Sequence, residues 1–353
     1  MNALIFIVVL VILIFIHELG HFLAARLVGI KVDEFGLGFP PRIWSKKKGE
    51  TLYSLNALPL GGFVKLAGEY GTADTRPGTF AAANVWRRIF VVVAGVIMNF
   101  ALAWLIFAVG YQFGLPPVTQ DLTRYRGAVV SESDIQVGRV VADSPAALAG
   151  LETGDILVAA TDQSSFTGTA DFQAYTRAHA GQSIQLTVER EAGVKTLSAT
   201  LGQSDAPLGV EIASDMHVKL PFGSALRAAS AEVWGITTGI GQTLWRLVSS
   251  PLNSRATADL SGPIGIYQAT SAAAQAGGDI LVLLVALLSV NLAVLNILPI
   301  PALDGGRLAF LIIEAVARRR VVREEIEGLV TTLGFILMIG LLVLLTVRDI
   351  IRL

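Results

Sequence analysis

Four long apolar segments restrict the architecture of this 353-residue chain more than any other feature. They are residues 3–26, 89–109, 280–303 and 329–347. Each has about 20 residues, and a helix of that length rises far enough to cross the roughly 30 Å core of a bilayer. The sequence therefore predicts a polytopic α-helical membrane protein with about four transmembrane helices, and the lipid bilayer as its surroundings.

The first segment alone also fits a cleaved signal peptide. A signal peptide begins with positive charge, whereas only Met1 and Asn2 precede the apolar run here. We therefore favour a retained span.

Charge is scarce in this chain and lies almost entirely outside the spans. Only 16% of the residues are charged and the formal net charge is −1. Such a composition excludes a disordered chain, a coiled coil and a basic nucleic-acid-binding domain, so no nucleic-acid partner is expected. The chain has no cysteine, which excludes disulfides and cysteine-ligated metals.

The segments that connect the spans differ in the sign of their charge. Residues 28–88 hold nine Lys or Arg against five acids, and residues 305–328 hold five Arg. Residues 118–213 hold six basic and twelve acidic side chains. The positive-inside rule then predicts that the first two segments are cytoplasmic and that the third, with both termini, lies outside.

Residues 118–213 have the pattern of a small folded domain. Strands are predicted at 137–142, 156–160, 184–190 and 196–201, with helices from Pro145 to Gly150 and near 171–179. The string VVADSPAALAGLETGDILVA resembles bacterial PDZ domains, which bind an extended peptide or a C-terminus as an added strand. A β-rich spacer is the alternative, and two candidate carboxylate-binding loops remain open. They are Leu208-Gly209-Val210 and Arg126-Gly127-Ala128.

The segment after this domain, residues 221–250, has few charges and two tryptophans. Trp234 and Trp245 with Arg227 and Arg246 suit an amphipathic helix at the membrane surface. A plain connecting helix explains the composition equally well.

Residues 17–21 place the polar motif His-Glu-Leu-Gly-His inside the first apolar segment. Histidines four residues apart share one face of a helix, so His17 and His21 can hold a single Zn²⁺. Glu18 is the candidate general base that activates water. A charged side chain costs about 2.5–3.5 kcal/mol in the middle of a span, which favours a function over polar groups merely satisfied by neighbouring helices.

A catalytic zinc ordinarily has three protein ligands. The other two histidines fall in or beside the predicted outer domain, so a carboxylate must complete the set. Asp304 is the best candidate because it follows the third span at the depth of His21, although it could also cap a helix. Pro299 and Pro301 break the helix before it, which is tolerated at membrane depth where the backbone lines a cavity.

Together these motifs resemble the site-2 protease family of intramembrane zinc metalloproteases, in the form of the bacterial regulator-of-sigma-E proteases but with a single PDZ domain. The resemblance covers nearly the whole chain: HExxH, the string NxxPxPxLDG at 296–305, and Ser-Gly-Pro-Ile-Gly at 261–265. It implies one Zn²⁺ per chain, a catalytic base and residues that hold the substrate. By position these are His17, His21 and Asp304 for zinc, Glu18 for the base, and Asn296, Pro299 and Pro301 for the substrate.

Residues 51–66 add a further part of the resemblance. Residues 51–58 alternate as a strand does, 59–62 predict a turn, and 63–66 predict a return strand. In the family, such a β-hairpin dips into the membrane beside the active site and pairs with an unwound substrate. Gly61, Gly62, Phe63 and Val64 are therefore candidate substrate-binding residues, and a soluble cytoplasmic hairpin is the alternative.

The predicted organisation has the first half of a membrane protease core at 1–117, the PDZ domain at 118–213, and an amphipathic connector with the second half of the core at 214–353. The resemblance implies hydrolysis within transmembrane segments of single-span membrane proteins, such as anti-sigma factors or remnant signal peptides. The expected location is the bacterial cytoplasmic (inner) membrane, with the PDZ domain outside and the active site near the cytoplasmic side.

Two functions of other classes fit the sequence less well than this one. A zinc transporter needs ionisable groups across the bilayer, and the second and fourth spans contain none. An inactive scaffold that presents a PDZ domain does not need the intact set of His17, Glu18, His21 and Asp304.

Overall fold

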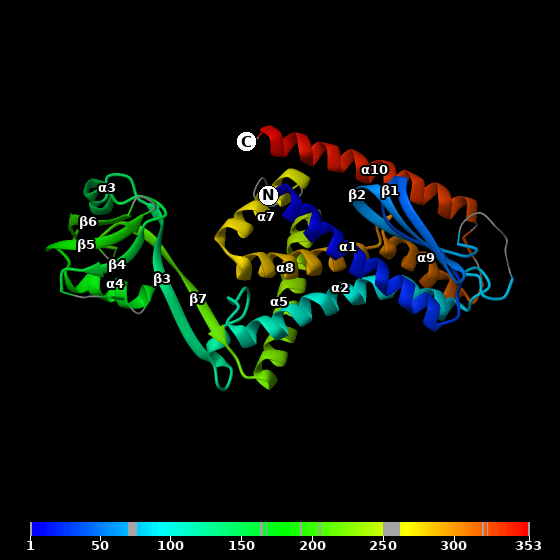
Figure 1. Cartoon of the computed structure of the whole chain (residues 1–353), viewed down its shortest axis with the longest axis horizontal. Helices are drawn as coiled ribbons and strands as arrows, with labels where there is room; N and C mark the ends of the chain where they lie inside the picture. The colour runs from blue at the N-terminus through cyan, green and yellow to red at the C-terminus, as the bar shows by residue number, and fades with distance from the viewer. Residues whose placement is uncertain are drawn as a thin grey trace. The chain divides into compact units, whose positions relative to one another are not determined.

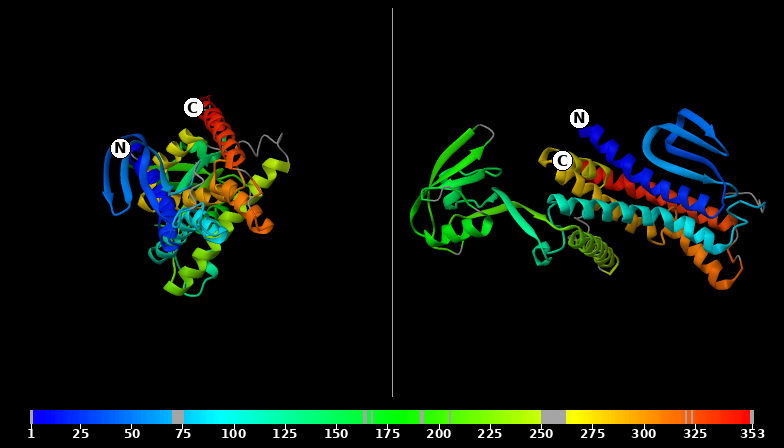
Figure 2. Two further views of the ribbon diagram at one scale, coloured as in Figure 1. Left: turned by 90° about the vertical axis from the view of Figure 1, so that its right-hand side faces the viewer. Right: turned by 60° about the horizontal axis from the view of Figure 1, so that its bottom comes forward.

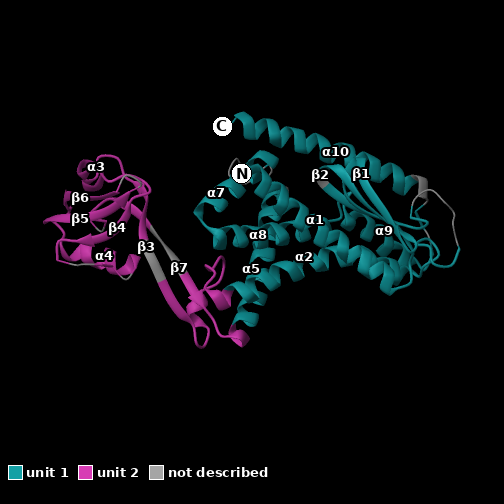
Figure 3. Ribbon diagram, viewed as in Figure 1, with its two compact units in different colours: residues 1–110, 225–353 teal, residues 111–224 magenta. Residues whose placement is uncertain are grey.

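The computed structural model describes residues 2–69, 76–162, 165–166, 168–190, 193–204, 206–249, 262–319, 321–322 and 324–351. The chain divides into two compact units, coloured separately in Figure 3. The first comprises Met1–Gly110 with Ala225–Leu353, and the second is Tyr111–Ser224. The predicted boundaries of the inserted domain, 118–213, fall inside the second unit.

The first unit is built mainly from long helices (Figures 1 and 2). Their bounds are α1 Asn2–Leu27, α2 Val85–Phe113, α5 Phe222–Ser249, α7 Pro263–Ala276, α8 Gly278–Ile297, α9 Asp304–Ala317 and α10 Glu324–Ile351. Within the described chain, α1, α2, α8 and most of α10 are long and apolar enough to cross a membrane. These helices coincide with the four predicted spans and support a multi-pass membrane protein.

The third predicted span is shorter in the structure than the sequence indicated. Helix α8 ends at Ile297, and residues 298–303 follow without helix before α9 begins at Asp304. The reason is Pro299 and Pro301, since proline lacks the N–H that a helix interior requires and its ring clashes with the preceding turn. The helix break predicted at the two prolines is therefore present, and only the first part of the predicted span 280–303 is helical before α9 begins.

A two-stranded sheet of β1 Val32–Lys48 and β2 Thr51–Leu66 lies beside α1 (Figure 1). This finding corrects the hairpin predicted within residues 51–66. The two strands meet at Gly49, whose positive φ of 64° suits a tight turn, and residues 59–62 belong to β2 itself.

The register of the sheet explains why the predicted hairpin does not form. Phe35 of β1 lies opposite both Tyr53 and Val64. The first part of β1 therefore lies between the two ends of β2, which the sequence had predicted to pair directly with each other. Sequence analysis missed β1 because Pro40 and Pro41 interrupt its pattern, and prolines ordinarily argue against a strand interior.

The second unit contains a five-stranded sheet with short helices. Its strands are β3 Val129–Val140, β4 Ile156–Ala160, β5 Ser183–Arg190, β6 Gly193–Thr200 and β7 Val210–Lys219. Its helices are η1 Leu122–Arg124, α3 Pro145–Ala149 and α4 Thr169–Ala178. The strand order is β6-β5-β4-β3-β7 with every neighbouring pair antiparallel, so β6 and β7 are the edges. The predicted elements between 137 and 201 are all present, whereas β7 extends past the predicted end at residue 213.

A buried ion pair joins the start of β4 to the end of β5 in this unit. Asp155 is fully buried and accepts hydrogen bonds from Arg190 Nε at 2.5 Å and Nη2 at 2.6 Å. The backbone N–H of Glu152 donates to the same carboxylate at 2.9 Å. The hydrogen bonds from the Arg190 guanidinium hold the pKa of Asp155 below its ordinary value.

We expect Asp155→Asn to lower hydrogen-exchange protection of β4 and β5 by about 10-fold, because the variant weakens two charge-assisted hydrogen bonds of the Arg190 guanidinium, which keeps its contact with Glu152. A depressed carboxyl pKa stabilises the folded state above the unfolded pKa of about 3.9, and this contribution is lost as the pH falls through the folded value. The difference between wild type and variant should therefore be full at neutral pH and shrink below about pH 4.

Mass spectrometry of exchanged peptides from the intact protein measures this difference. Arg139→Gln is the matched control, because it breaks an exposed pair with Glu211 whose atoms lie 3.6 Å apart. Equal protection in wild type and Asp155→Asn at neutral pH would contradict the role of the pair.

Candidate metal centre

Helix α1 places two imidazoles side by side within the first membrane unit. His17 and His21 are one turn apart, and their Nε2 atoms lie 3.2 Å from each other. Both rings face Gly95 of α2, where a Cβ atom added to the glycine would lie 2.4 Å from His21 Nε2 and 2.9 Å from His17 Cε1. Only a glycine at this position leaves room for both rings.

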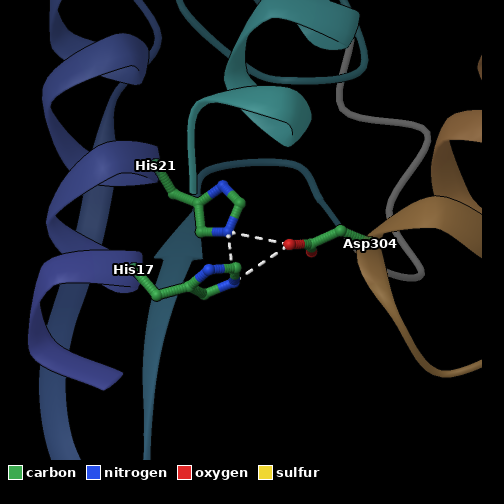
Figure 4. A group of neighbouring side chains, drawn as sticks. All are labelled: His17, His21 and Asp304. Carbon is green, nitrogen blue, oxygen red and sulfur yellow. Dashed lines mark hydrogen bonds and ion pairs between the residues drawn. The ribbon is translucent and has the colours of Figure 1, made fainter. Parts of the chain in front are cut away.

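The third predicted ligand reaches the same point from the far end of the chain. Asp304 is the first residue of α9, and its Oδ2 lies 3.0 Å from His17 Nε2 and 3.2 Å from His21 Nε2 (Figure 4). The segment before α9 turns sharply back on the helix, so a Cβ on Gly305 would collide with the carbonyl oxygen of Leu298 at 2.0 Å. The glycine after Asp304 therefore permits the approach that aims the carboxylate at the imidazoles.

The donor set fits a zinc ion. Asp304 Oδ2 is buried and has no hydrogen-bond donor among the described residues, although two imidazole nitrogens lie within 3.2 Å of it. In a tetrahedral site with bonds of about 2.0–2.1 Å, neighbouring ligand atoms lie about 3.3 Å apart, close to the separations found here. The three atoms are thus arranged as metal ligands would be, and His17, His21 and Asp304 are the residues that could hold the ion.

The other nitrogen of each imidazole has a partner that sets its tautomer. His21 Nδ1–H donates to the carbonyl oxygen of Val91 at 2.8 Å, which leaves Nε2 with a free lone pair. His17 Nδ1 lies 3.2 Å from the side-chain amide of Asn99. Because a side-chain amide keeps its shape when it is turned over, its Oδ1 can accept from His17 Nδ1–H. Both Nε2 atoms are then free to bind a metal.

Asn99 is itself fixed and was missed as a site residue by sequence analysis. It is fully buried, and Ser289 Oγ of α8 donates to its backbone carbonyl oxygen at 2.8 Å. One feature of the sequence could have identified it: Asn99 is the only amide or ionisable side chain within residues 89–109. Its role depends on a contact with α1 that the sequence pattern does not reveal.

Glu18 lies beside the three candidate ligands but is not part of their cluster. Its Cγ is 3.0 Å from the Cβ position of Gly62, so β2 passes directly over the candidate base. Gly62, Phe63 and Val64 pair with β1 on one side, and no other strand of the described chain pairs with them. This part of β2 is therefore an edge next to Glu18.

The remaining predicted residues lie around the same point. Asn296 Nδ2 is 3.5 Å from His17 Nε2, and Pro299 and Pro301 form the broken segment between α8 and α9. Gly61 lies in β2 against the ring of Phe39. Ser261, part of the third sequence motif, lies outside the described residues.

A cavity of about 520 Å³ opens beside Asp304. Its walls combine apolar side chains with charged groups that include Glu69, Arg88, Arg307 and Glu314. The candidate site is thus bordered by a cavity with charged walls.

Comparison with known proteins gives the same result as the geometry. The sequence matches the family described as Peptidase family M50 over residues 5–341. The chain belongs to this family, the site-2 protease family. A protein of Clostridium perfringens named "Putative zinc metalloprotease" is 35% identical over 343 residues, which cover 96% of this chain and 95% of the relative. A protein of Geobacillus kaustophilus named zinc metalloprotease RasP is 28% identical over 429 residues, which cover 98% of this chain and 96% of the relative.

Membership of the M50 family confirms the predicted family and the predicted class of enzyme, a zinc-dependent metalloprotease. The relatives carry zinc in their names, in agreement with the donor set of this chain. The roles of individual residues, the substrate and the orientation in the membrane are proposals that follow.

We expect Asn99→Leu to weaken zinc binding by about 10- to 100-fold, because the variant removes the group that fixes the His17 tautomer. Competition with a chelator of known affinity measures the change on purified protein. Thr238→Val in α5 is the control, since its hydroxyl donates only to carbonyl oxygens of its own helix. Unchanged zinc affinity in Asn99→Leu would show that Asn99 does not act on His17.

Proposed function

We propose that this protein is an intramembrane zinc metalloendopeptidase that hydrolyses a peptide bond within or near a transmembrane segment of another membrane protein. The observation that carries the proposal is the convergence of His17, His21 and Asp304 on one point, with two of the three on an apolar spanning helix. Two imidazoles and a carboxylate at this depth serve little purpose without a metal.

The protein's own side chains divide the chemistry between them. Bound zinc supplies a Lewis acid for the peptide carbonyl and for water. Glu18 takes a proton from the attacking water and passes it to the leaving amine nitrogen. His17, His21 and Asp304 hold the metal, and Asn296 extends its amide toward the same space.

Strand β2 is the element proposed to bind the substrate. A transmembrane helix satisfies its own peptide groups and has to be extended before it can be cut. The edge formed by residues 61–64 offers unpaired backbone groups beside Glu18, and an added strand would bring the scissile bond to the base.

We expect Glu18→Gln to abolish cleavage while one zinc per chain remains bound, because the amide keeps the shape of the side chain but accepts no proton. A proteome comparison of cells that carry wild type and Glu18→Gln should show uncut membrane fragments accumulating in the variant. Glu50→Gln, which alters an exposed carboxylate at the β1–β2 turn, is the control and should leave the fragments unchanged. Normal cleavage by Glu18→Gln would refute the assignment of the base.

We further propose that the second unit is a PDZ domain that screens substrates. A cavity of about 160 Å³ lies between α4 and the start of β7, and its walls include Leu208, Gly209 and Val210. Because β7 is an edge strand, an extended peptide could pair with it there. Of the two candidate carboxylate loops, this position supports 208–210 over 126–128.

If the unit admits only substrates whose outer domain has been trimmed, its removal should permit cleavage of untrimmed ones. Val129 and Lys219 are paired in the sheet, so a short flexible linker can replace the residues between them. Cleavage of full-length and trimmed forms of one single-span substrate by this variant measures the effect. Gln173→Trp, which fills the cavity beside β7, should act in the same direction without removing the unit. Identical selectivity in wild type and both variants would contradict the screening role.

The substrates are proposed to be single-span membrane proteins such as anti-sigma factors or remnant signal peptides. The location proposed is the bacterial inner membrane, with the second unit outside. The excess of Lys and Arg in residues 28–88 and 305–328 supports this orientation.

A further inference from the structure

Helix α9 presents polar side chains on the face that it buries. Asp304, Arg307, Leu311 and Glu314 recur at intervals of three and four, so they form one stripe along the helix. Leu311 of this stripe packs into the core that includes Val32, and it is 5% exposed. The charged members of the stripe are partly buried on the same face and line the cavity, whereas an amphipathic helix ordinarily carries apolar residues on its inner face.

Arg307, the next charged residue of the stripe after Asp304, connects α9 to β2 through Glu69. Arg307 Nη1 donates to Glu69 Oε1, and the guanidinium also lies 4.8 Å from the ring centre of Phe80. The second oxygen of Glu69 accepts from the backbone N–H of Leu66 at 2.9 Å, at the end of β2. The Glu69 side chain is only 7% exposed. One carboxylate thus joins the end of the proposed substrate strand to the helix that carries Asp304.

The second charged member connects α9 to α2. Arg88 donates from Nη1 to Glu314 Oε2 at 3.1 Å and from Nη2 to Glu314 Oε1. Arg88 is 5% exposed, and it lies one helical turn before Val91, whose carbonyl oxygen accepts from His21. The segment of α2 that orients one histidine is therefore also the segment that holds α9.

We propose that Glu69–Arg307 and Arg88–Glu314 are positioning pairs of the metal centre, which fix the rotation of α9 and thereby aim Asp304 at His17 and His21. The proposal rests on the function proposed above. Side chains reach about 5–6 Å from the axis of a helix, so a rotation of α9 by about 20° would move the carboxylate of its first residue by about 2 Å relative to the imidazoles.

The energetics favour a positioning role over a purely stabilising one. Buried ion pairs are often no more stabilising than apolar side chains of similar size, because both ions lose their hydration. Their geometry is specific, however, and a bidentate guanidinium–carboxylate contact defines both distance and orientation. Arg88–Glu314 is a bidentate contact of this kind, and the single contact between Arg307 and Glu69 holds α9 at a second height. Together the two links restrict the rotation of α9 in a way that Leu311 alone cannot.

The test uses zinc alone as the probe of the full-length protein in detergent. We expect Glu69→Gln and Glu314→Gln to weaken zinc binding by about 10- to 100-fold, measured by chelator competition on the folded fraction. The visible absorption of Co²⁺ bound in place of zinc, which reports four-coordinate geometry, should fall in both variants. Arg307→Lys keeps the positive charge beside Glu69 and should retain more affinity than Arg307→Gln.

Two controls separate positioning from general stability. Glu50→Gln breaks the exposed pair with Lys31 in the same unit and should change neither readout. Asp155→Asn breaks a buried pair in the other unit, so it should reduce stability without changing zinc affinity or the Co²⁺ spectrum.

Wild-type zinc affinity and an unchanged Co²⁺ spectrum in Glu69→Gln and Glu314→Gln would overturn the proposal. It would also fail if Arg307→Lys and Arg307→Gln lost zinc equally and only in proportion to unfolded protein. A wild-type protein that binds no zinc would instead contradict the proposed function, so the two failures are distinguishable.

Discussion

The need to satisfy polar groups inside an apolar helix governs the architecture of the first unit. Helix α1 carries two imidazoles within a span, where each nitrogen without a partner is costly. The surrounding helices supply those partners one by one: α2 provides the carbonyl oxygen of Val91 and the amide of Asn99, and α9 provides Asp304. Among the described residues, the Asp304 Oδ2 atom between the two Nε2 atoms has no hydrogen-bond donor, so this position would suit a bound cation.

The same need explains why the third span is interrupted. A continuous helix would carry the chain past the histidines and place a carboxylate at its side. Breaking it at Pro299 and Pro301 starts a new helix at Asp304, and the first turn of a helix favours negative charge. The break thus places an acidic side chain beside the two imidazoles, at the N-terminal end of a helix dipole.

Local patterns predicted the spans and the three residues that cluster at the candidate site, whereas the other parts depend on long-range contacts that no local pattern reveals. The spacing of His17 and His21 is a property of one helix, and Asp304 followed from the lack of another ligand at that depth. Strand β1 was missed because Pro40 and Pro41 conceal a strand that only its pairing with β2 reveals. Asn99 and Arg88 meet residues 82 and 226 positions away, and no pattern within α2 indicates such partners.

Strand β2 connects the two halves of the proposed reaction. It passes over Glu18 at Gly62, and its last residue is joined through Glu69 to the helix of Asp304. A peptide that pairs with residues 61–64 would therefore contact a strand that is itself in contact with Glu18 and is linked to α9, the helix that begins at Asp304. In the proposed reaction, substrate binding and the geometry of the metal site would therefore both depend on β2. A transmembrane helix that does not unwind and pair with β2 would change neither the position of Glu18 nor that of the candidate metal ligands.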